Sequence, residues 1–551
     1  MTSTAAASPL PGPFHKAFTE VVERDPGAEA LMAEDGRMTY GALREEVDRI
    51  ARALIACGLT RGDHIGILEG NSLRWAALFY AAASLGLVTV PLNTRFRVEE
   101  LNYTLAHEDI RLLFTADLFL GKIDFLAMLE EIEPAVASKL PGTQLPLLAQ
   151  LVVLGGRAPG GGRTFEAFLK AGEAVSGEEL AAARAAVTPD DILLIQFTSG
   201  TTSFPKGVQL THAAMLGNAK AVAERIGVRQ SDRYYSPRPF YHVAGTTLSL
   251  LVALVSGACL VTSATFEPGE ALDILERKRC TLTSGNETMF AMMLAHPSLP
   301  TRRLMLRGGW AAASDETMRR IEREMGSVEM VNAYGLSEAA PNVVISHHED
   351  SLELRASGLG LPHPGMELQI RDPQDGRPLP AGETGELCVR GWSVMKGYYR
   401  RPEETAAVLD GEGWLRTGDL GRLNEDGRFQ FVGRLKDVFR VGGENVAPME
   451  VETLLQKHPA VAFAQVVGVP DARLGEVPAA FVALREGQRA VPEELIAFCR
   501  QRCANFKVPR YLDIVESFEA IGMTGSSKVQ KNKLRDYAIA RFELAGAGVG
   551  G

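Results

Sequence analysis

The chain has 551 residues, of which 46% are apolar and 23% are charged, which is typical of a globular protein with large buried cores. At about 150 residues per domain, this length predicts three or four structural units. The net charge of −10 argues against a nucleic acid or an acidic membrane surface as the main partner, although a few lysines and backbone N–H groups can still bind an anion locally.

Six scattered cysteines show no C-x-x-C pair and no zinc-type spacing with histidine, which predicts buried, inert thiols in a reducing compartment. The N-terminus lacks a basic region followed by an apolar core, so no signal peptide is expected. The longest apolar run, residues 75–92, is interrupted by turn-like breaks and a proline, and is interpreted as a helix followed by a strand. We therefore expect a cytoplasmic protein with no integral membrane segment.

Elements predicted in chain order begin after a small-residue tail at 1–13, which is expected to be disordered, like the tail at 545–551. Apolar residues at helical spacing predict a helix around 43–54, and residues 63–70, 73–85 and 87–92 follow as strand, helix and strand. Strand-like segments recur at 232–240, 258–266 and 280–286. Such alternation predicts βαβ units and parallel sheets.

The pattern changes near residue 365 to short alternating segments with Gly and Asp turns, including a hairpin turn at 424–427, which predicts a β-rich subdomain over about 365–433. After Arg434 a third pattern begins, with its own helices and strands. The predicted fold is therefore α/β: a large N-terminal domain (14–435) with two βαβ-type sheet subdomains plus the β-rich subdomain, and a small mobile α+β C-terminal domain (436–544).

The run FTSGTTSFPKG, residues 197–207, follows the apolar run 192–195 and combines glycines, hydroxyl groups and a lysine, as a loop that holds phosphates does. It is not a Walker loop, because Pro precedes the Lys and Gly follows it. The next helix is predicted to begin around 211–212. A surface turn is the alternative interpretation, but the complete order of residues after a strand makes the phosphate loop more specific.

This run resembles the signature loop of the adenylate-forming (AMP-binding) superfamily, in its acyl- and aryl-CoA synthetase branch. Four more motifs follow in that family's order: NAYGLSEAA at 332–340, the Thr-Gly-Asp to Gly-Arg segment at 414–437, VGGENVAPMEVE at 441–452 and SSKVQKNKLR at 526–535. Five motifs in order leave little room for coincidence. The resemblance implies ATP, Mg²⁺ and CoA as cofactors, a small carboxylic acid as substrate, no nucleic acid, and a monomer or homodimer.

Site residues follow from the resemblance, motif by motif. Tyr334 would border the adenine, Glu338 would ligate Mg²⁺ together with Thr202, Asp419 would accept hydrogen bonds from the ribose with Arg434 in support, and Lys528 would be the catalytic lysine. The alternative interpretations, in the same order, are a core tyrosine, an acid at a helix start, a turn Asp and a solvated lysine. The further predicted nucleotide contacts are Thr198, Ser199, Gly200, Thr201, Lys206, Gly309, Trp310, Ala311, Asn332, Ala333, Gly335 and Ser337.

Two half-reactions are implied: a carboxylate and ATP give an acyl-adenylate and pyrophosphate, and a thiol then displaces AMP. A cation such as Lys528 suits the first step, because a carboxylate must approach a polyanion. In the family the C-terminal domain rotates between the two steps, with Lys436 at the hinge position. The predicted CoA contacts are Gly442, Gly443, Glu444, Arg473 and Lys507.

The acyl pocket is predicted to involve His242, Val243, Gly245, Asn286, Gly308, Trp310, Gly335 and Pro341. His242 and Thr198 are also catalytic candidates, and a satisfied core histidine is the alternative for His242. Asn286 and Glu287 bring polar groups that need partners if they are buried. The bulky Trp310 leads to the hypothesis that the pocket selects a compact or aromatic acid; the identity of the acid stays open.

Two serines depart from the family pattern, since Ser203 and Ser527 stand where glycine is usual. If those positions need positive φ, each serine costs about 1 kcal/mol. Three functions compete: an acid–CoA ligase, an adenylating ligase that transfers to a carrier-protein thiol, an amine or another nitrogen acceptor, and a non-catalytic ATP-binding relative. Lys528, Glu338 and Asp419 argue against the third, and the GGEN-type loop favours the first.

Overall fold

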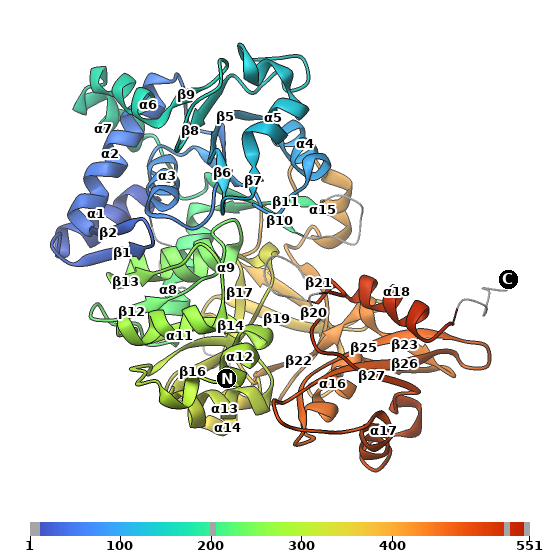
Figure 1. Ribbon diagram of the computed structural model, residues 1–551. Helices are drawn as coiled ribbons and strands as arrows, with labels where there is room; N and C mark the ends of the chain where they lie inside the picture. The colour runs from blue at the N-terminus through green and yellow to red at the C-terminus, as the bar shows by residue number, and fades with distance from the viewer. Residues whose placement is uncertain (1–11, 199–204, 519, 523–528, 545–551) are drawn as a thin grey trace.

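The structure is a computed structural model that describes residues 12–198, 205–518, 520–522 and 529–544. Two large sheets form the body of the molecule, with a small antiparallel sheet and the C-terminal elements beside them (Figure 1). The predicted α/β architecture, with a large N-terminal part and a small C-terminal part, is confirmed.

The first large sheet is parallel through its centre and antiparallel at both edges. Its strands in spatial order are β18 (Leu361–Pro362), β17 (Asn342–Ile345), β16 (Glu329–Gly335), β15 (Gly308–Ala312), β14 (Leu282–Asn286), β12 (Arg233–Tyr235), β13 (Cys259–Val261), β1 (Glu29–Ala33) and β2 (Gly36–Thr39). The carboxyl ends of parallel strands meet at one edge of a sheet, where open α/β folds bind ligands.

The second large sheet is parallel except for its edge strand. Its order is β11 (Lys206–Thr211), β10 (Ile192–Thr198), β4 (Val88–Pro91), β3 (His64–Leu68), β5 (Ile110–Thr115), β8 (Gln150–Val153) and β9 (Arg163–Thr164). A small ribbon, β6 (Leu118–Phe119) and β7 (Ile123–Asp124), lies next to it.

Helices cover both sheets, as the alternating pattern predicts. They are α1 (Phe14–Arg24), α2 (Tyr40–Ala56), α3 (Leu73–Ser84), α4 (Val98–His107), α5 (Phe125–Ile132), α6 (Phe165–Ala171), α7 (Gly177–Ala185), α8 (His212–Arg225), α9 (Val243–Gly245), α10 (Val252–Ser256), α11 (Pro268–Arg277), α12 (Glu287–Ala295), α13 (Asp315–Met325), α14 (Leu352–Ala356) and α15 (Pro402–Val408). Every residue of α3 except Arg74 is buried, because the helix packs inside the main core. Ser72 caps its start by accepting a hydrogen bond from the Trp75 N–H.

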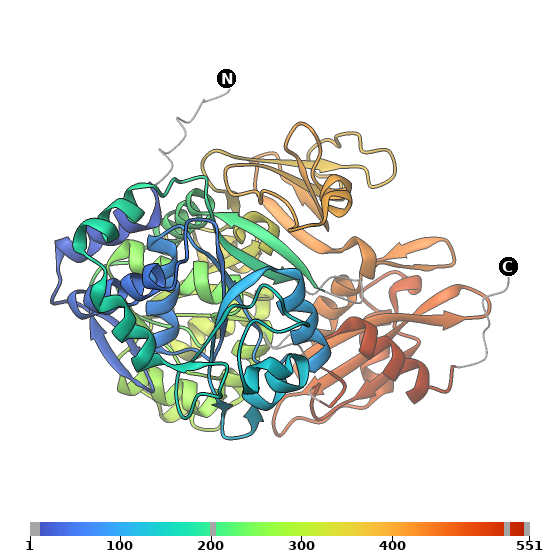
Figure 2. The same ribbon diagram turned by 90° about the horizontal axis from the view of Figure 1, so that it is seen from above.

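The small antiparallel sheet is the predicted β-rich part, with order β19 (Met366–Arg371), β20 (Gly385–Gly391), β21 (Leu415–Leu423) and β22 (Phe429–Arg434). The predicted turn at 424–427 joins β21 to β22, where the Asn424 N–H donates to the Arg428 carbonyl. Figure 2 shows the yellow-to-orange part of the chain apart from the blue-and-green body.

The C-terminal elements, orange to red in both views, lie beside this body (Figures 1 and 2). They form a sheet of order β24 (Glu444–Val446), β23 (Phe439–Val441), β26 (Gly475–Leu484), β25 (Val461–Asp471), with β27 (Tyr511–Ile514) on β26 and helices α16 (Pro448–Gln456), α17 (Pro492–Arg500) and α18 (Lys531–Arg541). Buried residues from Phe439 to Ala538 form a core of their own. The predicted domain boundary at residue 436 falls in the short turn Leu435–Asp437 between β22 and β23 and stays a prediction.

All six cysteines lie in the described residues and none is in a disulfide. Burial raises the pKa of the Cys259, Cys280 and Cys499 thiols to about 12, so these thiols are inert at neutral pH. Among the described residues, no helix combines the length and apolar character needed to cross a membrane.

Candidate active site

The predicted phosphate loop connects two antiparallel strands. Thr198, the last residue of β10, pairs with Lys206, the first residue of β11, so the loop joins the ends of a hairpin. The side chain of Gln196 donates to the Tyr241 carbonyl over 2.8 Å, which ties this hairpin to the segment that carries His242. After β11 the predicted helix α8 begins at His212, and Thr211 caps it.

The segment of residues 396–399, between β20 and α15, runs along β11. The Tyr399 N–H donates to the Gly207 carbonyl, and Tyr398 forms a bridge with Val208. The Lys206 ammonium lies 4.7 Å from the centre of the Tyr398 ring, which is a cation–π contact. The lysine is therefore held at the base of the phosphate loop by an aromatic side chain from the far end of the N-terminal part.

Tyr398 also contacts the predicted magnesium ligand. Its phenol donates to Glu338 Oε1 over 2.9 Å, and the Glu338 carbonyl accepts from the Met395 N–H. Burial and the neighbouring Glu338 carboxylate raise the pKa of the Tyr398 phenol, which keeps it a neutral donor. Tyr398 thus brings the predicted phosphate lysine and the predicted metal ligand to one place. Sequence reasoning missed Tyr398; the run Gly-Tyr-Tyr at 397–399 was the available signal.

Next to Glu338 lies a cavity of about 220 Å³ that extends toward the Thr-Gly-Asp motif. Its lining residues are Leu336, Glu338, Glu386, Tyr398, Ala407, Val408, Leu415, Arg416, Thr417 and Gly418. Because Tyr398 and Glu338 line this cavity together with Thr417 and Gly418, it joins two of the predicted motifs.

Asp419 and Tyr334, predicted to hold the ribose and the adenine, are hydrogen-bonded to each other. The Tyr334 phenol donates to Asp419 Oδ2 over 2.7 Å, and the Arg434 Nε lies 3.3 Å from Asp419 Oδ1. The Tyr334 ring stacks on Phe431 at 5.3 Å. Burial, followed by the Asp419 charge, raises the pKa of the Tyr334 phenol well above its usual range. One face of an aromatic ring, a buried carboxylate and an arginine thus converge here.

Asp419 and Tyr334 both lie in β-strands. Asp419 lies inside β21 rather than between strands, because the pairing of β20 with β21 shifts register at this motif and Gly418 adopts a φ of 69°. Tyr334 lies near the end of β16 rather than in a turn, since β16 continues through Gly335 in antiparallel pairing with β17.

The carboxyl ends of β14, β15 and β16 bring together residues predicted for the adenine and the acyl pocket. Asn286 ends β14, Trp310 and Ala311 lie in β15, and Ala333 lies in β16. The Asn332 amide donates to the Ala313 carbonyl over 2.7 Å. Gly309 has a φ of 127°, and a side chain there would collide with the Thr283 carbonyl, so β15 needs glycine to pass β14. The remaining predicted residues in this region are Gly308, Gly335, Ser337 and Pro341, and Gly335 lies against the Pro341 carbonyl.

His242 lies directly before α9 and caps it. Its Nδ1 accepts the Ala244 N–H over 3.1 Å, so in the neutral ring the proton is on Nε2, and Val243 and Gly245 belong to α9 itself. Trp310 is buried and its indole N–H donates to the Tyr234 phenol over 2.8 Å. Asn286 caps α12 by accepting from the Met289 N–H, and Glu287 accepts from Ser314 and Thr317. The polar groups at 286–287 therefore have the partners that burial demands.

Four of the five residues predicted for CoA lie at the tips of two hairpins of the C-terminal sheet, and the fifth, Lys507, lies in the short helical turn Asn505–Lys507. Gly442 and Gly443, with φ of 59° and 95°, form a two-residue turn between β23 and β24, where Glu444 is exposed. The Gly442 N–H donates to the Leu474 carbonyl in the β25–β26 turn that holds Arg473. Lys507 is already paired, with its ammonium 2.5 Å from Glu450 Oε2.

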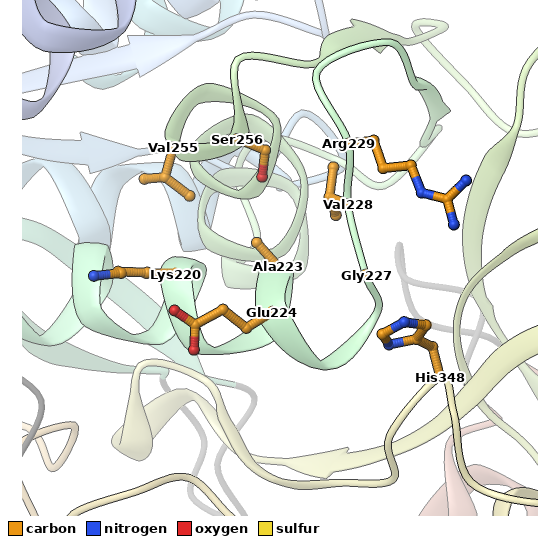
Figure 3. Close-up of a pocket in the computed structure, with 9 residues that line it drawn as sticks. All are labelled: Lys220, Ala223, Glu224, Gly227, Val228, Arg229, Val255, Ser256 and His348. Carbon is orange, nitrogen blue, oxygen red and sulfur yellow. The ribbon is translucent and has the colours of Figure 1, made fainter.

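Several predicted residues lie outside the described residues: Ser199, Gly200, Thr201, Thr202, Ser203, Ser527 and Lys528. A separate open depression of about 500 Å³, drawn in Figure 3, contains none of the predicted site residues. Lys220 and Glu224 lie at one side of it, and Arg229 and His348 at the other (Figure 3). It is therefore distinct from the candidate site.

Comparison with known proteins shows the family of this chain. The AMP-binding enzyme family matches residues 18–399, and the AMP-binding enzyme C-terminal domain matches residues 450–528. The acyl-CoA ligase sidI of Aspergillus fumigatus is 36% identical, with 92% of this chain and 87% of that protein covered. The mitochondrial medium-chain acyl-CoA ligase ACSF2 of Bos taurus is 34% identical, with 95% and 87% covered.

Among solved structures, the anthranilate CoA ligase AuaEII in complex with anthranoyl-AMP superimposes with a TM-score of 0.85 at 25% identity, covering 98% of this chain and 99% of that one. The shared motifs, the fold and these relatives all agree. The chain belongs to the AMP-binding enzyme family, in its acyl-CoA synthetase and ligase branch.

Proposed function

We propose that this protein is an ATP-dependent carboxylic acid–CoA ligase that forms an acyl-adenylate, releases pyrophosphate, and then transfers the acyl group to the thiol of CoA. The observation that carries this proposal is the position of Tyr398, which contacts both Lys206 and Glu338. A lysine at the end of the β10–β11 hairpin, with a carboxylate brought close to it by Tyr398, suits a nucleoside triphosphate with its metal ion. A cytoplasmic location is part of the proposal.

Each half of the nucleotide has its own predicted groups. Lys206 supplies positive charge to the phosphates, while Asp419 and Arg434 suit the ribose and Tyr334 the flat base. Lys528 is the proposed catalytic lysine, because its charge would bring the acid carboxylate to the α-phosphate. No protein base is needed, since a carboxylic acid is already ionised at neutral pH.

Magnesium fits the donor set at Glu338. Among the described residues, no three His, Cys, Asp or Glu side chains gather as a metal cage. Mg²⁺ is commonly held by one or two carboxylates together with substrate phosphates and water, which matches a single carboxylate beside a phosphate loop. When bound, the ion would offset phosphate charge, and Thr202 is the second predicted ligand.

The second step is proposed to follow rotation of the C-terminal part about Lys436, in the turn Leu435–Asp437. Rotation would bring the turn at Gly442 and Gly443, with the neighbouring Arg473, to the acyl-adenylate. The contact between the Gly442 N–H and the Leu474 carbonyl supports movement of these two tips as one unit.

The test measures pyrophosphate release with a library of carboxylic acids, with and without CoA, alongside thioester formation. We expect acid-dependent pyrophosphate release in both conditions and thioester only with CoA, and Glu338→Gln and Asp419→Asn should reduce pyrophosphate release. AMP release with an amine or a carrier-protein thiol, but no CoA thioester, would instead establish another acceptor. No acid-dependent pyrophosphate with any acid would contradict adenylation altogether.

A further inference from the structure

Arg238 is a buried arginine, and among the described residues no carboxylate pairs with it. The residue is only 5% exposed. Nη1 lies 3.4 Å from the Met289 sulfur, a weak acceptor, and Nε is buried without a hydrogen-bond partner. Burial lowers the pKa of the Arg238 guanidinium to about 10, which still leaves it protonated at neutral pH. A buried charge without a counter-charge lowers the free energy of unfolding, and proteins ordinarily avoid it.

Arg355 is a buried arginine with a structural role, and its contacts differ from those of Arg238. It is 4% exposed, and all three of its nitrogens are satisfied: Nε by the Asp350 carbonyl, Nη1 by the Met330 carbonyl and Nη2 by Glu322. Arg238 is equally buried, but its Nε has no partner and its Nη1 has only a sulfur acceptor among the described residues. A neutral side chain of similar size would fill the same space at lower cost, so packing does not explain an arginine there.

The position of Arg238 is set by the backbone around it. The Asn71 amide donates to the Arg238 carbonyl over 2.9 Å, and the same amide accepts the Phe240 N–H over 2.8 Å. Asn71 is itself buried. The segment after β12 is therefore held at two points, so the backbone that carries Arg238 is fixed.

Arg238 contacts Trp310, one of the residues predicted for the acyl pocket. The guanidinium carbon lies 5.5 Å from the centre of the Trp310 ring. Met289, its other neighbour, donates its N–H to Asn286 at the end of β14. His242 follows Arg238 by four residues at the end of the same segment. The arginine thus lies beside Trp310 and, through Met289, near Asn286, in the region predicted for the acyl pocket.

The surroundings of Arg238 are polar as well as buried. Ser236 Oγ lies 2.7 Å from Ser249 Oγ and accepts from the Ser284 hydroxyl over 3.2 Å. All three serines are 1% exposed or less. The Tyr234 phenol lies in the same region, next to Trp310. A pocket for a plain alkyl chain would be lined by apolar side chains alone, whereas here an arginine and hydroxyl groups lie beside Trp310 and Met289.

We propose that Arg238 is a specificity-determining residue that binds a second anionic group on the substrate, and that the preferred acid is therefore a compact dicarboxylic acid. This inference rests on the proposed function for the role of the first carboxylate. The distal carboxylate would accept two N–H groups of the guanidinium and supply the missing counter-charge. A monocarboxylic acid of the same length would leave the arginine buried and unpaired.

The experiment compares matched acids on the full-length protein: malonate, succinate, glutarate and adipate against propionate, butyrate, valerate and hexanoate. Pyrophosphate release is measured for wild type, Arg238→Met and Arg238→Lys. We expect wild type to prefer a dicarboxylate by at least about tenfold in kcat/KM, and Arg238→Met to lower that ratio about 100-fold. Arg238→Lys should retain part of the preference. Equal ratios in wild type and Arg238→Met would overturn the proposal.

Thermal stability separates a recognition role from a structural one. Because Arg238→Met removes an unpaired buried charge, its Tm should equal or exceed that of wild type, whereas the matched control Arg355→Met should have a lower Tm. The preferred dicarboxylate should raise the Tm of wild type and not that of Arg238→Met. A fall in Tm for Arg238→Met as large as that for Arg355→Met would contradict the proposal.

These readouts also separate the two proposals. Release of pyrophosphate with monocarboxylic acids only would leave the ligase function intact and overturn the role of Arg238. Arg238-dependent thermal protection by a dicarboxylate, without pyrophosphate release from any acid, would support the anion site and contradict adenylation. If no dicarboxylate gives either effect, the anion site is wrong.

Discussion

The Tyr334 phenol donates a 2.7 Å hydrogen bond to Asp419 Oδ2 across the interface between the first large sheet and the small antiparallel sheet. These side chains are proposed to hold the base and the ribose of the same nucleotide. The interaction therefore orders both halves of the nucleoside site before any ligand arrives. A ribose hydroxyl that binds Asp419 would join or replace the phenol as a donor.

Replacing Tyr334 by Phe should lower the Tm in the absence of nucleotide, because the buried Asp419 carboxylate loses a donor at a cost of about 1–3 kcal/mol. If ribose hydroxyls then supply that donor, AMP should raise the Tm of Tyr334→Phe more than that of wild type. Differential scanning calorimetry with and without AMP measures both effects. Tyr80→Phe, which loses a buried hydrogen bond to the Leu250 carbonyl elsewhere, is the control and should respond to AMP as wild type does. Equal AMP responses in all three proteins would contradict this account.

Tyr398 gives a prediction about the metal–phosphate region. Tyr398→Phe retains a ring for Lys206 but removes the donor to Glu338, so the carboxylate loses its fixed orientation. We expect the KM for MgATP to rise about tenfold, because the loss of one charge-assisted hydrogen bond weakens binding by about that factor. The Mg²⁺ concentration needed for half-maximal activity should rise as well. Steady-state pyrophosphate release over a Mg²⁺ titration measures it.

The adjacent tyrosine supplies the matched control. Tyr399 donates to Asp109 over 2.8 Å and does not contact Glu338, so Tyr399→Phe loses a similar bond away from the site. Its KM for MgATP should stay within about twofold of wild type. If both variants raise KM equally, the effect belongs to the packing of residues 396–399 and not to Glu338.

Much of the fold follows from patterns that are local in sequence. The alternation of strands and helices predicted the parallel sheets, and the turn at 424–427 predicted a hairpin. The prediction of Glu338, Asp419 and Lys206 as site residues depends on motifs that were identified through the family resemblance. Tyr398 was not predicted, because its role requires residues 396–399 to pair with β11, which lies almost 200 residues earlier.

Arg238 illustrates a second limit of sequence reasoning. An arginine in a polar segment is ordinarily solvated, and only burial together with the missing counter-ion makes it unusual. Asp419 shows a third, since the register shift that places it inside β21 depends on the neighbouring strand rather than on the Thr-Gly-Asp motif. In each case the deciding contact lies far away in the chain.

Trp310 should limit the length of the acid. Trp310→Gly removes a buried indole that lies between Arg238 and Tyr234, so it should extend the preferred acid by several carbons while costing about 3–5 kcal/mol of stability. Trp310→Phe retains a ring and should retain the wild-type length preference. Pyrophosphate release across an acid series of increasing length measures the change. An unchanged optimum in Trp310→Gly would contradict the hypothesis that this residue sets the length.

Glu108 predicts how stability depends on pH. Its side chain is fully buried, and neither oxygen has a hydrogen-bond partner among the described residues; burial, with a smaller effect of Asp109, raises the pKa of Glu108 from its ordinary 4.5 to about 8. Between these values the folded state holds a proton that the unfolded state releases, so this group makes stability fall as pH rises from about 4.5 to about 8, by at most about 1.4 kcal/mol per pH unit.

Glu108→Gln mimics the neutral acid and removes that fall, so its stability relative to wild type should increase steadily between pH 5 and pH 8 and then level off. Urea denaturation at several pH values measures the difference, with Glu99→Gln at an exposed position of α4 as the matched control. A constant difference between Glu108→Gln and wild type across this range would show that Glu108 does not titrate there.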